Sequence, residues 1–123
     1  MKKIIVASFF VTFIFLVIAS CQHETVVPEQ QVTFSHDVGN ILRANCAFSG
    51  CHDTLGGEHR RVDRYEDVSS IVTPGKPHES DLFRRITAYS NSEDLMPKPP
   101  MSPLADDNIR KIYIWILQGA QNN

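Results

Sequence analysis

Two thiols and an imidazole lie within seven residues of this 123-residue chain: Cys46, Cys51 and His52. A cysteine pair closed by a Cys-His step is typical of covalent haem attachment, in which each thiol adds to a porphyrin vinyl group. The adjacent imidazole is then held beneath the ring and can bind iron at one axial position. The usual link between the thiols has two residues and this one has four, so it must bulge. Ser49 and Gly50 suit a bulge because glycine adopts left-handed backbone at little cost.

Two other chemistries fit the same side chains. In an oxidising compartment Cys46 and Cys51 could form a disulfide. Together with His52 and His59 they could also hold zinc, which prefers thiolate and imidazole ligands. The motif by itself leaves these alternatives open.

A second chemical feature follows at residues 95–101, where Met96 and Met101 lie among three prolines. Proline removes a backbone donor and fixes φ, so this segment predicts a stiff extended loop. A methionine thioether suits the second axial position of a haem whose first ligand is histidine. Either sulfur of this loop could serve.

The first residues predict export. Lys2 and Lys3 precede an apolar run over 4–19, and small residues lead into Cys21. This pattern is typical of a secretory signal that ends in a lipobox. The run is short for a membrane span, which needs about 20 apolar residues, although an uncleaved anchor helix with an incidental Cys21 is the alternative. We expect a bacterial lipoprotein, acylated at Cys21 and working on the periplasmic, outer-membrane or cell-surface side.

These boundaries divide the chain into a signal peptide (1–20), a flexible tether (21–32) and one domain (33–123). Lysine and arginine number 12 against 14 acidic residues, and removal of Lys2 and Lys3 leaves the mature chain more acidic. Nucleic acid is therefore not an expected partner, because binding it favours a basic face. Loss of the apolar leader also leaves a thin supply of core residues, and a short chain of this kind usually needs a staple or a cofactor.

Four helices should position the chemical groups, over 35–45, 65–71, 81–89 and 106–118, which predicts an all-α fold. Ser35 and Ser80 are the expected N-caps of the first and third helices, and Gly119 is the expected left-handed residue after the last. Gly39 either lets another helix approach closely or lies on the surface without a role. Apolar residues at helical spacing give the first and last helices faces that we expect to pack on each other: Val38, Ile41, Leu42 and Ile109, Ile112, Tyr113, Ile116.

Four stretches together resemble the bacterial class I c-type cytochrome domain, and more narrowly the Bacteroidetes and planctomycete-type cytochromes. They are 34–53 with the four-residue link, the Pro-Gly-Lys-Pro connector and helix start at 74–82, Met96–Pro97, and the closing Trp-Ile-Leu-Gln-Gly-Ala at 115–120. The resemblance covers most of the mature chain. It implies a small cytochrome c-like fold, with about four helices around one covalently bound haem c.

The resemblance also implies roles for single residues. Cys46 and Cys51 would bind the haem covalently, His52 would be the proximal ligand, and Met96 the distal ligand ahead of Met101. The implied function is electron transfer and not enzymatic catalysis, between redox proteins of a respiratory or periplasmic chain. The alternatives are a haem sensor or peroxidase-like protein, or a lipoprotein interaction domain with a Cys46–Cys51 disulfide and no haem.

Three finer expectations accompany this assignment. The ring nitrogen of His52 that does not bind iron should donate to a carbonyl, for which Pro74 is the candidate. Ala105 departs from the Ser or Thr that caps the last helix in the family, and Asp106 is expected to replace it. Arg60 and Arg61 could contact a haem propionate or be solvated loop charges.

Overall fold

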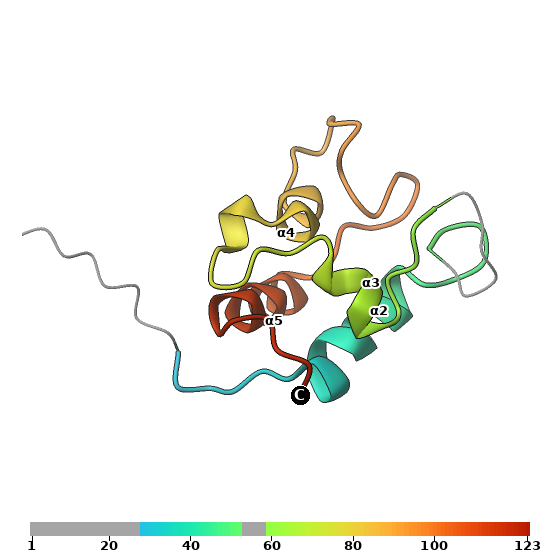
Figure 1. The fold of residues 1–123 in the computed structure, drawn as a ribbon. Helices are drawn as coiled ribbons and strands as arrows, with labels where there is room; N and C mark the ends of the chain where they lie inside the picture. Colours follow the sequence, from blue (N-terminus) through green and yellow to red (C-terminus); the bar gives the residue numbers. More distant parts are fainter. Residues whose placement is uncertain (1–27, 53–58) are drawn as a thin grey trace, which may run out of the picture.

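The computed structural model describes residues 28–52 and 59–123, and every regular element in these two ranges is helical (Figure 1). The all-α prediction is therefore confirmed for the described chain, which holds four α-helices and no strand. None of its helices has the length and apolar character to cross a membrane. The expected signal peptide and the acylated Cys21 lie outside the described residues. The elements follow in the order η1 (Phe34–Val38), α2 (Gly39–Asn45), α3 (Tyr65–Ser69), η2 (Pro77–Glu79), α4 (Asp81–Ile86) and α5 (Asp106–Leu117).

The first helix starts earlier than the sequence predicts, and Ser35 is not its cap. Thr33 occupies the N-cap position, and its hydroxyl accepts a hydrogen bond from the His36 amide at 3.2 Å. The Asp37 carboxylate accepts in return from the Thr33 amide at 3.0 Å. This is the reciprocal arrangement of a capping box, with its acidic partner one residue later because the first turn is π-helical. The amides of Phe34 and Ser35, at the start of the helix, donate to Asn123, 89 and 88 residues further along the chain.

Gly39 marks the change from π-helix to α-helix. Its amide donates to the Phe34 carbonyl, five residues earlier. A Cβ atom at this position would lie 2.9 Å from that carbonyl oxygen. Both expectations for Gly39 were wrong: the residue is buried, and the close approach comes from its own helix and not from a neighbour.

Helix α5 is the centre of the core, and the first helix packs against it as predicted. Ile112 and Ile116 are fully buried and Trp115 is 1% exposed. The Phe34 ring lies 5.6 Å from the Trp115 ring and 5.4 Å from the Tyr65 ring of α3. These three aromatic side chains join η1, α3 and α5, and so fix the helix that leads into the thiol pair.

Ser80 occupies the N-cap position of α4, as predicted, but its side chain makes no cap hydrogen bond to the helix. Its hydroxyl is completely buried, accepts from the Thr73 amide at 2.9 Å and donates to the Lys76 carbonyl at 2.9 Å. Helix α4 ends at Ile86 and not at Tyr89, whose side chain is 86% exposed. Ser80 therefore holds the turn before α4 instead of closing the helix itself.

For α5, the predicted N-terminal cap was wrong and the predicted residue after the C-terminal end was correct. Asp106 does not cap the helix, because the N-cap position belongs to Ala105 and no side chain bonds there. Gly119 has φ of 99°, the left-handed conformation predicted for the residue after the helix.

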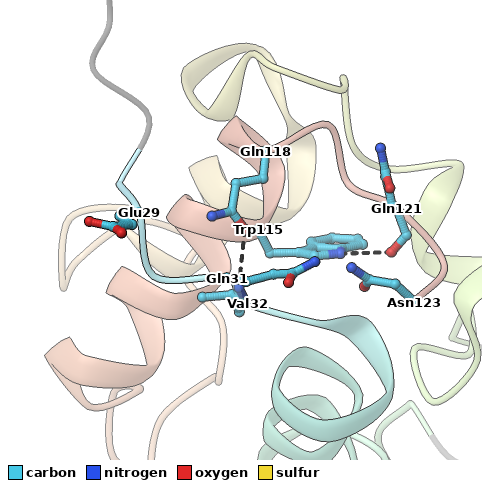
Figure 2. Close-up of a pocket in the computed structure, with 7 residues that line it drawn as sticks. All are labelled: Glu29, Gln31, Val32, Trp115, Gln118, Gln121 and Asn123. Atoms are coloured by element: carbon cyan, nitrogen blue, oxygen red, sulfur yellow. Dashed lines mark hydrogen bonds between the residues drawn. The ribbon is translucent and has the colours of Figure 1, made fainter.

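The described end of the expected tether, residues 28–32, lies against α5 (Figure 2). The Gln118 side chain accepts from the Val32 amide at 3.1 Å and donates to the Gln30 carbonyl at 2.8 Å. Val32 is 2% exposed and belongs to the core. The contacts of the domain therefore begin before residue 33.

Candidate functional site

The thiol pair and the imidazole lie in a tight loop at the end of α2. The Cys46 amide continues the helix by donating to Leu42, and the His52 amide then returns to the Cys46 carbonyl at 3.2 Å. Gly50 has φ of 83°, so the predicted left-handed bulge is confirmed. The four-residue link thus folds back on itself, which brings His52 beside the first cysteine.

The His52 ring is oriented by a backbone carbonyl. Its Nδ1 atom lies 2.6 Å from the carbonyl oxygen of Arg60. Because that oxygen can only accept, Nδ1 is the donor in this contact, and the lone pair lies on Nε2 when the imidazole is neutral. The expectation of a carbonyl partner is confirmed, but Pro74 as its source was wrong. The carbonyl belongs to Arg60, eight residues after His52 in the sequence.

Arg60 is itself held by α3. Its guanidinium donates to the Ser70 hydroxyl at 2.6 Å, and that hydroxyl donates to the Asp67 carbonyl at 2.7 Å. The neighbouring Arg61 forms an ion pair with Asp63 at 2.8 Å. A chain of hydrogen bonds therefore runs from the end of α3 to the His52 ring. The sequence identified Arg60 only as a charge and gave no signal for the role of its carbonyl.

The two thiols differ in their surroundings. Both are free and half-buried, but Cys46 packs against the hydrophobic core. This burial, with a smaller effect of the neighbouring Cys51 charge, raises the pKa of the Cys46 thiol to about 11. Cys46 is therefore a neutral thiol at physiological pH.

Met96 is the more enclosed of the two loop methionines. Its side chain is half-buried, whereas Met101 is 41% exposed. The Met96 amide donates to the Arg85 carbonyl of α4 at 3.0 Å, whereas the Met101 amide bonds only within its own loop, to Lys98. The tertiary structure thus fixes the position of Met96 relative to a helix.

The methionine loop and the thiol loop leave the helical core on the side away from the N-terminal segment (Figure 1). No hydrogen bond or ring contact within the described ranges joins Met96 to His52. The His59 ring lies 5.8 Å from that of His52. Across 28–52 and 59–123, no three His, Cys, Asp or Glu side chains gather as a metal-binding group.

A hollow of about 350 Å³ lies elsewhere, between the N-terminal segment and the end of α5 (Figure 2). None of the residues predicted for chemistry lines it. The Trp115 indole points along it and donates to the Gln121 carbonyl at 2.9 Å. Its lining is mostly polar: Glu29, Gln31, Val32, Trp115, Gln118, Gln121 and Asn123.

Comparisons with protein-family models, with curated proteins and with solved structures each find no match for this chain.

Proposed function

We propose that this chain is a monohaem c-type cytochrome that carries electrons between redox proteins outside the cytoplasmic membrane of a bacterium. Its cytochrome c-like domain would carry one haem c, held by thioethers to Cys46 and Cys51. His52 would bind iron on one face and Met96 on the other. An acylated Cys21 would anchor the protein to a membrane, which keeps the carrier near membrane-bound partners.

The observation that carries this proposal is the hydrogen bond between His52 and the Arg60 carbonyl. An imidazole that ligates a metal nearly always donates its other ring nitrogen to a carbonyl or carboxylate. Here the donor is Nδ1, at 2.6 Å from the carbonyl oxygen, which leaves Nε2 as the nitrogen that would bind iron. This orientation directly after a Cys-x4-Cys motif supports ligation by His52.

The two thiols and Met96 are also chemically suited to hold a haem. Each thiol would add across one vinyl bond, so that sulfur bonds to one carbon and hydrogen to the other. The haem supplies one-electron redox chemistry at its iron when bound. Met96 presents a neutral thioether on a stiff loop, and a thioether ligand favours the reduced state relative to a second imidazole. Cys46 is half-buried and packs against the hydrophobic core at the start of the attachment loop.

Absorbance spectroscopy of the mature protein, produced together with haem maturation factors, tests the proposal. We expect a Soret band, and a haem-sized mass increment that persists after denaturation. Replacing Cys46 and Cys51 together by serine should abolish the covalent increment. A colourless wild-type protein with a Cys46–Cys51 disulfide would overturn the proposal in favour of an interaction module.

Two matched variants test the second ligand. Met96→Ala should abolish the low-spin spectrum of a six-coordinate haem, whereas Met101→Ala should leave it unchanged. The opposite pattern assigns the ligand to Met101. A high-spin wild-type spectrum that neither variant alters would point to a five-coordinate haem and therefore to a sensor or peroxidase-like protein.

A further inference from the structure

Helix α4 holds the methionine loop at two points, and a single residue supplies both. The Arg85 carbonyl accepts from the Met96 amide at 3.0 Å. The Arg85 guanidinium lies 3.6 Å from the carboxylate of Asp94, two residues before Met96. The backbone and the side chain of Arg85 thus contact both ends of the short segment from Asp94 to Met96.

Arg85 is fixed on its own helix before it reaches the loop. Its Nε atom donates to the Asp81 carboxylate, one turn earlier, at 3.0 Å. This hydrogen bond lowers the pKa of Asp81 below its usual range and raises that of Arg85, so both groups are charged at neutral pH. A side chain already ordered by one ion pair loses less conformational freedom when it forms a second.

The loop is otherwise held locally. The Leu95 amide donates to the Ser92 carbonyl, and the Lys98 ammonium donates to the Glu93 carbonyl. These bonds shape the loop but do not connect it to a helix. Leu95 is buried at 6% exposure, yet it is not part of the main hydrophobic core. Arg85 is thus the polar connection between the described loop and α4.

We propose that Arg85 is a positioning residue that keeps the Met96 sulfur in place for ligation. This inference rests on the proposed function, in which Met96 is the second axial ligand. A thioether competes with any small ligand that can enter when the loop moves away. Arg85 lowers the population of that displaced state, so it controls how readily external ligands replace Met96.

Arg84 provides a matched control on the same helix. Its guanidinium donates to the same Asp81 carboxylate at 3.0 Å, and its side chain is 64% exposed. Its ion pair with Asp81 stays within α4 and does not extend to Asp94. Arg84→Ala therefore removes an equal charge and a similar helix ion pair, while it leaves the loop connection in place.

The test is titration of the haem-loaded protein with imidazole, followed by absorbance. Arg85 and Asp94 are 41% and 77% exposed, and exposed ion pairs contribute little, so we expect a modest effect. Arg85→Ala and Asp94→Asn should each raise the imidazole affinity about 2- to 4-fold, because a displaced loop frees the ligand position. Arg84→Ala should leave it unchanged, and Arg85→Lys should restore part of the wild-type value. Equal affinities in Arg85→Ala and Arg84→Ala overturn the positioning role.

Amide hydrogen exchange of the segment around Met96 gives a second readout, independent of ligand binding. Arg85→Ala should speed exchange of the Met96 amide about 2- to 4-fold relative to Arg84→Ala. Arg85→Ala keeps the backbone carbonyl that accepts from Met96, so unchanged exchange in this variant overturns the role of the Arg85 side chain. A wild-type protein without a Soret band overturns the proposed function and this inference together, whereas a coloured protein without the Arg85 effects overturns only the inference.

Discussion

Burial of the Cys46 thiol has a measurable consequence for its reactivity, which bears on the proposed attachment of haem. Only the thiolate attacks a disulfide reagent. The structure raises the pKa of Cys46 from 9.0 to about 11, first through burial and then through Cys51. At pH 8 this change lowers the thiolate fraction about 100-fold. A thiolate of higher pKa is also more nucleophilic. With a Brønsted coefficient of about 0.4–0.5, this raises the rate constant of the thiolate about 8-fold. The net expectation is a reaction about 10-fold slower in the folded than in the unfolded protein.

The assay uses reduced, haem-free protein and a small aromatic disulfide, with peptide mass spectrometry to separate Cys46 from the other thiols. Rates for the same cysteine are compared in buffer and in denaturant, so that the reagent and the neighbouring sequence are identical. Cys51→Ser removes the smaller cause of the pKa change and retains burial, so most of the protection of Cys46 should persist. The rate should rise with pH up to about 11.

Equal rates for Cys46 in folded and unfolded protein would refute the reasoning. Loss of all protection in Cys51→Ser would also contradict it, because that result would make charge and not burial the main cause. Confirmation would mean that Cys46 resists disulfide formation in the apoprotein and is retained as a thiol. That is the form required for addition to a vinyl group.

Three further predictions concern the scaffold. Gly39→Ala should destabilise the protein by about 1–2 kcal/mol in urea unfolding although alanine is the better helix former, because the new Cβ would meet the Phe34 carbonyl at 2.9 Å; a stabilised variant would contradict the π-turn. Ser80→Ala should cost about 1–3 kcal/mol and lower the melting temperature, because it leaves the Thr73 amide without its partner, whereas the Lys76 carbonyl keeps the Glu79 amide; the exposed Ser90→Ala is the control, and equal melting temperatures would refute the role. The pKa of Asp81 is depressed by Arg85, so its stabilising contribution is present above the unfolded pKa of about 4 and is lost as pH falls through the folded value; between neutral pH and pH 3 the wild type should therefore lose more unfolding free energy than Asp81→Asn, and parallel curves would contradict this.

Local pattern was sufficient to predict several parts of this molecule. The apolar spacing of residues such as Ile112 and Ile116 fixed the helical faces, because side chains three and four apart lie on the same side of a helix. Gly119 and Gly50 predicted left-handed backbone, because that conformation favours glycine over other residues. The thiol pair and the adjacent imidazole were visible at once, since their chemistry depends on residues close together in the chain.

The sequence did not predict hydrogen-bond partners that lie far apart along the chain. The carbonyl that orients His52, the residue that satisfies the first amides of η1 and the helix that holds Met96 all depend on where the backbone passes in space. Every residue has a carbonyl, so no residue type marks the one at Arg60 in advance. Gly39 shows the same limit, because its close contact arises from a π-turn that helical periodicity does not encode.

The sequence alone thus determined which groups can do chemistry and which helices surround them, since both follow from residue type and short-range spacing. Only the tertiary structure decided how those groups are held: His52 by Arg60 and Met96 by Arg85. The physical reason is that hydrogen bonds and burial depend on the distance between atoms in the folded chain, and periodicity constrains that distance only within a helix or a turn.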